Sequence, residues 1–361
     1  MRRFLAPIVI AIVALALPAH AADPYFKGRT VNLIVGFEAG GGVDVSARLF
    51  AQYFGKHIPG NPTVVVQNMP GSSAMKAHNY IFEAAKGDGE NLMWGPWFPV
   101  SQILEQPGVR FKYQDFALVG AVSTSGYAVY VRTDVVPGGL KKGADILKAQ
   151  GLKFAGQNPF NSFDLMGRMS LELFDVRYGY ITGYRGSAGI RAAVMKGEAN
   201  IGVDSANGYR TGVEATIIKP GTAIPVWSLP ELDATGKYVR PAALPEIPMV
   251  LDVYKEAFGK EPSGIKWEAM RLVMDYIASI GQVIVGPPSL NKQALADLRQ
   301  GAYDTFKDKG YLADQEKSMG SVSAGVDLAR AEKTLRSLGT IKPELVAHIR
   351  HHVESGEKVN Q

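Results

Sequence analysis

Two glycine-containing turns, each joining a short apolar run to a helical pattern, constrain this chain more than any other feature. Residues 31–35 form a β-type run that leads through glycines 40–42 into apolar positions at helical spacing. The unit repeats at once, because the β-branched run at 63–66 leads through Gly71 into a second helical face, and a third apolar run follows at 91–94. Strands that alternate with helices in this way predict an α/β fold with a mainly parallel sheet and helices on both faces.

The alternation stops at a polar segment and then starts again. Residues 123–126, with the sequence Ser-Thr-Ser-Gly, separate two apolar runs and predict a hinge. A proline-rich stretch at 220–248 predicts an irregular connection. The length of 361 residues also favours two domains. We expect a discontinuous first domain over 22–123 and 235–361 and a second domain over 124–234. Further helical patterns lie at 144–149, 163–174, 187–195, 267–276, 290–309, 324–338 and 343–353.

Residues 1–21 predict a signal peptide that is removed on export. Arg2 and Arg3 precede an apolar run at 5–17, and Ala19 and Ala21 place small residues where a signal peptidase reads. The run is shorter than the ~20 residues that a membrane-spanning helix needs. The chain contains no cysteine, which excludes disulfides and thiolate metal sites. We therefore expect the mature protein in the periplasm of a Gram-negative bacterium.

Charge and motifs exclude several classes of function. The formal charge is +5, and basic residues alternate with acidic ones, so a nucleic-acid partner is not expected. Val45 stands where a dinucleotide-binding turn needs glycine, and the chain contains no phosphate loop, nucleophile elbow or zinc-protease motif. The spacing of His348, His351 and His352 is compatible with metal binding, but no neighbouring carboxylate pair completes a site. We expect these histidines on a solvated helix end, and neither a metal nor a cofactor.

The two turns have the chemistry of an anion site. Glycines let the main chain approach a ligand, and the free N–H groups of a first helical turn favour negative charge. The structural alternative for the first turn is a tight bend in which Asp44 caps the helix. Turns after neighbouring parallel strands lie side by side, so both can address one ligand. Each helix end contributes only about 0.3–1 kcal/mol, whereas micromolar affinity needs about 8 kcal/mol. A second domain must therefore close over the ligand.

Four segments, in this order, resemble one family. They are GFEAGGGVD at 36–44, VVVQNMPG at 64–71, GYRGSA at 183–188 and KGEANIGVD at 196–204. Together they resemble the TctC/Bug family, the periplasmic solute receptors of tripartite tricarboxylate transporters. The resemblance covers nearly all of the chain after the leader. It implies a two-lobed binding protein of the type II-like, Venus flytrap build, which captures an organic carboxylate and delivers it to a membrane permease.

The resemblance also implies where the ligand binds. Main-chain N–H groups of 40–44 and 71–74 would hold one carboxylate, while Ser162, Phe163 and Asp204 would face it from the other lobe. Trp97 either stacks on the ligand or packs on the hinge, and Arg185 is the best candidate for a cation. The full set of expected ligand-binding residues is Phe37, Gly40, Gly41, Gly42, Val43, Asp44, Gly71, Ser72, Ser73, Ala74, Trp97, Ser162, Phe163, Arg185 and Asp204.

Two other functions stay open at this point. A periplasmic hydrolase or isomerase would use Asp44, Asp204 and the hydroxyls of Ser72 and Ser73 on a similar acid. A sensor would pass its liganded state to a membrane signalling partner. For the receptor we expect two kinds of partner, a small carboxylate and permease subunits, and a monomeric state.

Overall fold

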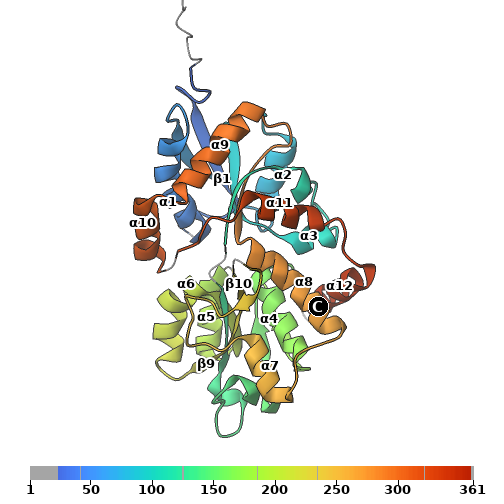
Figure 1. Ribbon diagram of the computed structural model, residues 1–361. Coiled ribbons are helices and arrows are strands. Elements are labelled where there is room, and N and C mark those ends of the chain that lie inside the picture. Colours follow the sequence, from blue (N-terminus) through green and yellow to red (C-terminus); the bar gives the residue numbers. More distant parts are fainter. Residues whose placement is uncertain are drawn as a thin grey trace, which may run out of the picture.

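The computed structural model describes residues 23–40, 42–123, 126–184, 186–233, 235–320 and 322–358. Figure 1 shows two lobes, one above the other, each built around its own sheet. The predicted signal peptide at 1–21 lies outside the described residues. The strands are β1 (Thr30–Val35), β2 (Thr63–Asn68), β3 (Asn91–Pro96), β4 (Ala117–Val122), β5 (Tyr127–Arg132), β6 (Lys153–Ala155), β7 (Gly179–Ile181), β8 (Ile201–Ser205), β9 (Ala223–Leu229), β10 (Glu231–Leu232), β11 (Tyr238–Val239) and β12 (Gln282–Gly286).

Helices connect these strands and cover the sheets. The α-helices are α1 (Gly42–His57), α2 (Met75–Glu83), α3 (Pro99–Ile103), α4 (Ser162–Leu173), α5 (Gly186–Lys196), α6 (Ala206–Gly208), α7 (Val250–Phe258), α8 (Ile265–Ser279), α9 (Lys292–Thr305), α10 (Lys309–Met319), α11 (Leu328–Ser337) and α12 (Pro343–Lys358). The short 3₁₀ helices are η1 (Tyr113–Asp115), η2 (Thr133–Val135) and η3 (Gly143–Lys148), and η4 (Tyr209–Ile218) is a π-helix.

The α/β class and the two-lobed build are confirmed, but the sheets are mixed rather than mainly parallel. The first sheet has the order β2-β1-β3-β12-β4, and the second has the order β7-β6-β8-β5-β9. In each, the strands joined by helices pair in parallel, whereas β12 and β5 run antiparallel to both of their neighbours. The physical reason is that β12 and β5 enter their lobes from the border between them, in the direction opposite to the other strands.

The strand register brings the carboxyl ends of the parallel strands to that border. Val35, at the end of β1, pairs with Asn68 at the end of β2 and with Trp94 near the end of β3. In the second lobe Ser205, at the end of β8, pairs with Tyr127 at the start of β5, where the chain has just crossed from the first lobe. The turns that follow these strands therefore face the opposite lobe, which is where open α/β sheets bind ligands.

Each face of the first sheet has its own core. On one face α1, α9 and α10 pack around aromatic residues, among them Phe50, whose ring stacks on Trp94 at 4.7 Å. On the other face α2 and α11 contribute Ile81 and Leu335 to a second cluster. These two layers hold β1, β2 and β3 rigidly, so the turns at their ends start from fixed positions.

The chain crosses between the lobes in three places: after β4, before β12 and after α11. The first crossing lies at the predicted hinge, of which Thr124 and Ser125 are outside the described residues. There the main chain of Ser123 donates to the carbonyl of Ala324 at 2.8 Å, and that of Gly281 donates to Val122 at 2.8 Å. These hydrogen bonds connect the end of β4 to the segments before β12 and before α11 at the border between the lobes.

The packing differs from the expected division at 235–361. Helices α7, α8 and α12 all contribute to the core of the second lobe, with Val253, Met270 and Ile349 as examples. In Figure 1 these helices lie beside the lower sheet. The faces of the first sheet are covered mainly by α1, α9, α10, α2 and α11, and α8 also contributes Tyr276 to the first lobe's core. We therefore propose that the second lobe comprises 126–279 together with α12.

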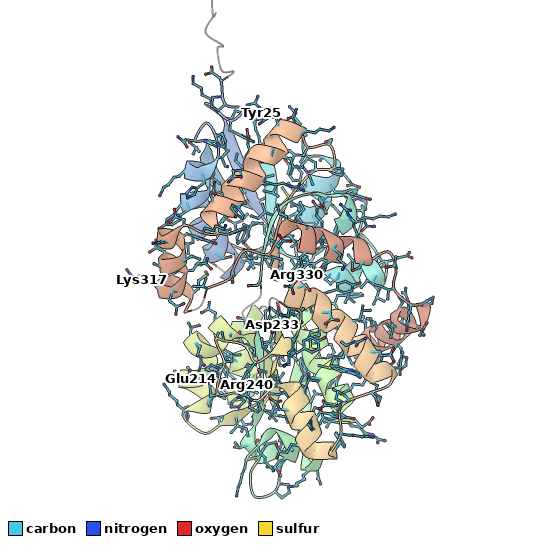
Figure 2. All side chains as sticks on the ribbon, in the orientation of Figure 1. Tyr25, Glu214, Asp233, Arg240, Lys317 and Arg330 are labelled. Atoms are coloured by element: carbon cyan, nitrogen blue, oxygen red, sulfur yellow. The ribbon has the colours of Figure 1, made fainter. Side chains whose placement is uncertain are left out.

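Side chains of both lobes reach into the space between the two ribbons, as Figure 2 shows. Charged residues lie near this border on both sides, including the labelled Asp233 below it and Lys317 and Arg330 above it. Within the described ranges, no helix combines the length and the apolarity required to cross a bilayer.

Candidate functional site

The turns after β1 and β2 touch each other. Gly36, directly after β1, lies so close to the second turn that a Cβ built on it would be 2.3 Å from the Cβ of Ala74. Only glycine fits there without displacing main chain, and the contact fixes the distance between the turns. The expectation that the two turns lie side by side is therefore met.

Asp44 locks the first turn instead of facing a ligand. It is buried, and its Oδ2 accepts hydrogen bonds from the main-chain N–H of Gly40 at 2.8 Å and from Nε of Arg48 at 2.9 Å. Its Oδ1 accepts from the side chain of Asn68 at 2.8 Å, which also donates to the carbonyl of Phe37. The Arg48 guanidinium, helped by these donors, lowers the pKa of Asp44 to about 2. The carboxylate and the Gly40 N–H are thus used within the turn, and the expected contacts of both with a ligand stay predictions.

The other expected residues of the first turn are placed differently. Gly42 opens α1 with no neighbouring atom against its Cα, whereas Val43 and Phe37 are partly buried against the core. Gly41 lies outside the described residues. None of the described residues of the first turn lines the cavity described below, and the charge of Asp44 is paired within the turn with Arg48.

The second turn is strained and has free donors. Gly71 has φ 149°, and the three residues that follow, Ser72, Ser73 and Ala74, have φ of 48°, 51° and 70°. Left-handed backbone costs a non-glycine residue roughly 1–2 kcal/mol. Among the described residues, none accepts a hydrogen bond from the N–H of Ser72 or Ser73. Strain of this kind is typical of ligand clamps, and exposed consecutive N–H groups favour an anion.

A cavity of about 320 Å³ opens beside this turn, between the lobes. The lining comes from the second turn, from α2, α3 and the segment that follows α3, and from the segment before α4 in the other lobe. These residues are Ser72, Ser73, Met75, His78, Phe98, Ser101, Gln106, Val109, Phe111, Asn158, Pro159, Phe160 and Asn161. A hydrogen bond of 3.1 Å from the Asn158 side chain to the Ser73 hydroxyl joins the two lobes at its edge.

Asp164 positions the part of the second lobe that faces the cavity. It is buried in the first turn of α4, and its Oδ2 accepts from the main-chain N–H of Gln157 at 2.5 Å and of Asn158 at 2.9 Å, and from the Tyr180 hydroxyl at 2.8 Å. Burial raises the pKa of Asp164 to about 7. Asn161 caps the same helix by accepting from the N–H of Phe163 at 2.9 Å. The segment at 157–161 is therefore held by its own lobe before any ligand arrives.

Of the residues expected to face the ligand from the second lobe, those described are not among the cavity's lining residues. Phe163 packs its ring edge-on against Tyr127, with centroids 4.8 Å apart, and Ser162 does not line the cavity. Asp204 is buried and pairs with Nε of Arg191 at 2.7 Å. Burial raises its pKa although Arg191 opposes the shift. Its partner lies within its own lobe and it does not line the cavity, so its predicted contact with the ligand stays a prediction.

The turn after β3 places two neighbouring aromatic residues in different environments. Trp97 is buried, donates from Nε1 to the carbonyl of Ile280 at 2.8 Å, and so packs at the crossing before β12. Phe98 instead remains partly exposed and lines the cavity. The position of Trp97 favours packing at the hinge over stacking on a ligand, which stays a prediction. Arg185 lies outside the described residues, so its proposed role as a cation stays a prediction.

Several lining residues escaped the sequence reasoning, His78 above all. The ring is buried; its Nδ1 lies 3.0 Å from the carbonyl of Ala74, and its Nε2 lies 3.1 Å from the Tyr113 hydroxyl. A carbonyl only accepts, so Nδ1 carries the proton and Tyr113 donates to Nε2. Burial lowers the pKa of His78 to about 4, so the ring is neutral at neutral pH. A lone histidine in a helical pattern gives no sign of this arrangement.

The C-terminal histidines do not form a metal site. His348 is partly buried and His352 is buried against α4, at 3.2 Å and 2.7 Å from the two carboxylate oxygens of Glu172, whereas His351 is exposed. The expected solvated helix end is therefore correct only for His351, because the sequence does not show that Glu172 faces this helix. No cluster suited to a metal ion occurs in the part of the chain that the structure describes.

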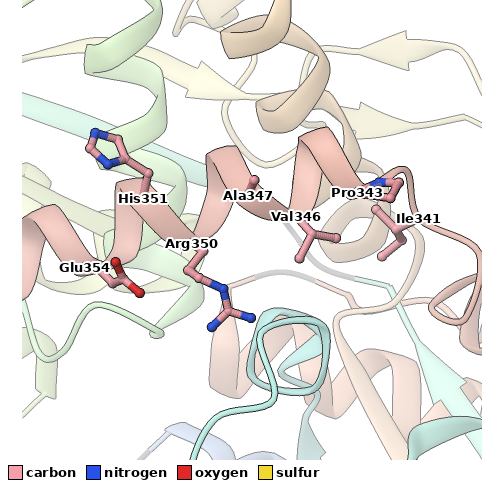
Figure 3. A pocket seen from close by; sticks show the side chains of 7 residues that line it. All are labelled: Ile341, Pro343, Val346, Ala347, Arg350, His351 and Glu354. Carbon is pink, nitrogen blue, oxygen red and sulfur yellow. The ribbon is translucent and has the colours of Figure 1, made fainter.

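A second hollow, of about 490 Å³, runs along the outer side of α12 (Figure 3). Its lining comes from this helix and the residues just before it: Ile341, Pro343, Val346, Ala347, Arg350, His351 and Glu354. In Figure 3 Arg350 and His351 point in opposite directions. A ligand site needs polar groups that converge, so the interlobe cavity is the better candidate.

Comparison with solved structures defines the class of fold. The chain has the fold of two-lobed periplasmic solute-binding proteins, and the similarity covers 91–92% of it. A TctC solute-binding protein from Polaromonas matches with a TM-score of 0.62 and 16% identity, over 91% of this chain and 99% of that one. The periplasmic binding protein BugD matches with a TM-score of 0.58 and 18% identity, over 92% and 97%.

A third solved structure was determined with a ligand. This R. palustris protein with adipate matches with a TM-score of 0.60 and 16% identity, over 92% of this chain and 96% of that one. No protein-family model and no curated protein matches the sequence. At these identities the likeness establishes the fold, and the chemistry of the site must come from this chain's own residues.

Proposed function

We propose that this chain is a periplasmic receptor that captures a small organic carboxylate between its lobes and delivers it to the permease of a tripartite tricarboxylate transporter. One observation carries the proposal: the strained turn at 71–74, where the N–H groups of Ser72 and Ser73 have no acceptor among the described residues, lines a cavity whose other wall belongs to the second lobe. The fold, and the adipate held by one solved structure of this fold, support it.

The energetics explain why both lobes are needed. Charge-assisted hydrogen bonds contribute about 1.5–3 kcal/mol each, so two N–H groups supply roughly 3–6 kcal/mol. Micromolar affinity requires about 8 kcal/mol. The remainder must come from surface covered when the second lobe closes, which the segment at 157–161 is placed to provide. When the lobes open, the ligand loses its contacts with the second lobe, and this weaker binding allows the ligand to be delivered.

Calorimetry with matched ligands tests the capture step. A panel of mono-, di- and tricarboxylates is titrated into protein purified without refolding, and each acid that binds is compared with its uncharged primary amide. We expect at least one acid to bind at micromolar concentration or below and its amide to bind about tenfold more weakly or worse, because the N–H donors favour charge. Failure of every acid to bind to folded protein, or equal binding of acid and amide, would contradict the proposal.

Export and delivery need separate measurements. N-terminal sequencing of the protein from periplasmic extracts should begin close to Ala22 if residues 1–21 are removed. Loss of the chain from its native cell should abolish uptake of the labelled acid, while a receptor that only signals would leave uptake intact. Mass spectrometry after incubation should recover the bound acid unchanged, whereas a hydrolase or isomerase would convert it.

A further inference from the structure

The walls of the interlobe cavity are apolar over most of their area. Met75, Phe98, Val109 and Phe111 reach it from the first lobe, and Phe160 reaches it from the second. Phe98 and Phe160 are only partly buried, although both are large apolar side chains that a closed core would cover. Aromatic residues left partly open at a cavity from two opposed lobes provide surfaces for an apolar ligand.

Among the residues that the structure describes, the lining of this cavity holds no cation for a second carboxylate. None of its described lining residues is a lysine or arginine, and none is an aspartate or glutamate. His78 is neutral and both of its ring nitrogens are bonded, to Ala74 and to Tyr113. Burying an ionised carboxylate without a partner is strongly unfavourable. A diacid placed in this cavity would therefore leave one of its charges uncompensated.

One edge of the cavity suits a carboxylate. The free N–H groups of Ser72 and Ser73 and the side chain of Asn158 lie where the two lobes meet. The rest of the lining combines apolar side chains, such as Val109 and Phe111, with the uncharged polar side chains of Ser101, Gln106 and Asn161. With a volume of about 320 Å³, the cavity is at the small end of ligand pockets, which span ~300–1,000 Å³.

We propose that the solute is a monocarboxylate with a compact apolar body, aromatic or aliphatic, whose carboxylate binds at Ser72 and Ser73 while its body lies between Phe98 and Phe160. This inference rests on the proposed function and specifies its substrate class. It differs from the dicarboxylate held by the solved R. palustris structure. The difference arises because this cavity surrounds the far end of the ligand with side chains that carry no charge.

Ligand pairs that differ in one carboxylate test the inference on the unaltered protein. Calorimetry in one buffer compares hexanoate with adipate. It also compares phenylacetate with a diacid that carries a second carboxylate on the same benzene ring. We expect the monoacid of each pair to bind about tenfold more tightly or better, since the second charge is unpaired. Diacids that bind as tightly as their monoacids overturn the inference but leave a carboxylate receptor. If no acid binds, the proposed function itself fails.

A charge placed in the wall gives an independent test. Val109 is partly buried at the cavity, so Val109→Glu should weaken binding of the preferred monoacid about tenfold or more. Val65→Glu is the matched control, because Val65 is 40% exposed on the edge strand β2 and does not line the cavity. Thermal unfolding shows whether both variants are folded. Unchanged affinity in a folded Val109→Glu variant would place the apolar body elsewhere and overturn the inference.

Discussion

A methyl group at Gly36 should push the two cleft turns apart. A Cβ on this residue would lie 2.3 Å from the Cβ and 2.7 Å from the Cα of Ala74. Carbon atoms in contact need about 3.5–4.0 Å, so main chain must move by roughly 1 Å or more. Gly42 offers a matched control a few residues away, because a Cβ there meets no atom within 4 Å.

The expected magnitudes follow from that contrast. Overpacking of this kind costs about 1–3 kcal/mol, so Gly36→Ala should lower the free energy of unfolding by that amount. Gly42→Ala has the same composition change and should leave it unchanged or raise it by about 0.4–1 kcal/mol, through the lower entropy of the unfolded chain. Gly36→Ala should also weaken ligand binding about tenfold or more, because a site loosened by ~1 Å loses its hydrogen-bond geometry.

Urea denaturation and calorimetry measure the two effects, and a double variant tests their cause. Ala74→Gly removes one of the two clashing atoms and relieves a φ of 70°. Combined with Gly36→Ala it should restore part of the lost stability, so the two substitutions should not be additive. If Gly36→Ala proves as stable as Gly42→Ala and binds the acid equally well, contact between the turns does not define the site.

Three further predictions concern groups around the cavity. The pKa of Asp164 is raised from 3.8 to about 7, so between these pH values the folded chain binds one more proton than the unfolded chain. The stability of the protein relative to its Asp164→Asn variant should therefore fall by about 1.4 kcal/mol per pH unit from pH 5 to pH 7. Urea denaturation measures this change, and a rise in relative stability would contradict the assignment. Tyr113→Phe removes the donor to His78 and should cost about 1–3 kcal/mol of unfolding free energy in the same assay, whereas no loss would mean that the hydroxyl is dispensable. Asn158→Ala removes the bond to Ser73 and should weaken ligand binding by about 1 kcal/mol while leaving the unfolding midpoint within a degree or two; a large drop in that midpoint would show that the bond stabilises the lobes themselves.

Strands are where sequence reasoning worked best on this chain. The runs at 31–35, 63–66 and 117–122 all lie in observed strands, because short buried strands read as continuous β-branched or apolar segments. Helix limits were less certain. The helix predicted at 290–309 ends at Thr305, and a separate helix, α10, begins at Lys309, where the Asp308 side chain accepts hydrogen bonds from the N–H groups of Gly310 and Tyr311. The helix α7 and the π-helix η4 were not predicted.

In the candidate site, features that depend on neighbouring residues were predicted from the sequence, whereas features that depend on distant residues were not. That two glycine-containing turns lie together followed from the order of strands, and the contact between Gly36 and Ala74 confirms it. Which groups those turns leave free did not follow. The Asp44 carboxylate accepts hydrogen bonds from Arg48 and from Asn68, which is 24 residues away along the chain. Only the tertiary structure shows that the hydrogen bonds of this carboxylate stabilise the turn.

The sequence by itself determined the α/β class, the two lobes and the crossing at 123–126, because hydrophobic periodicity and turn residues are properties of neighbouring positions. The tertiary structure alone decided the cavity, whose walls join residues 72–111 to residues 158–161 of the other lobe. It also decided that His78 is neutral and that Asp204 pairs with Arg191. Burial and charge pairing depend on segments far apart in the chain, so no local pattern encodes them.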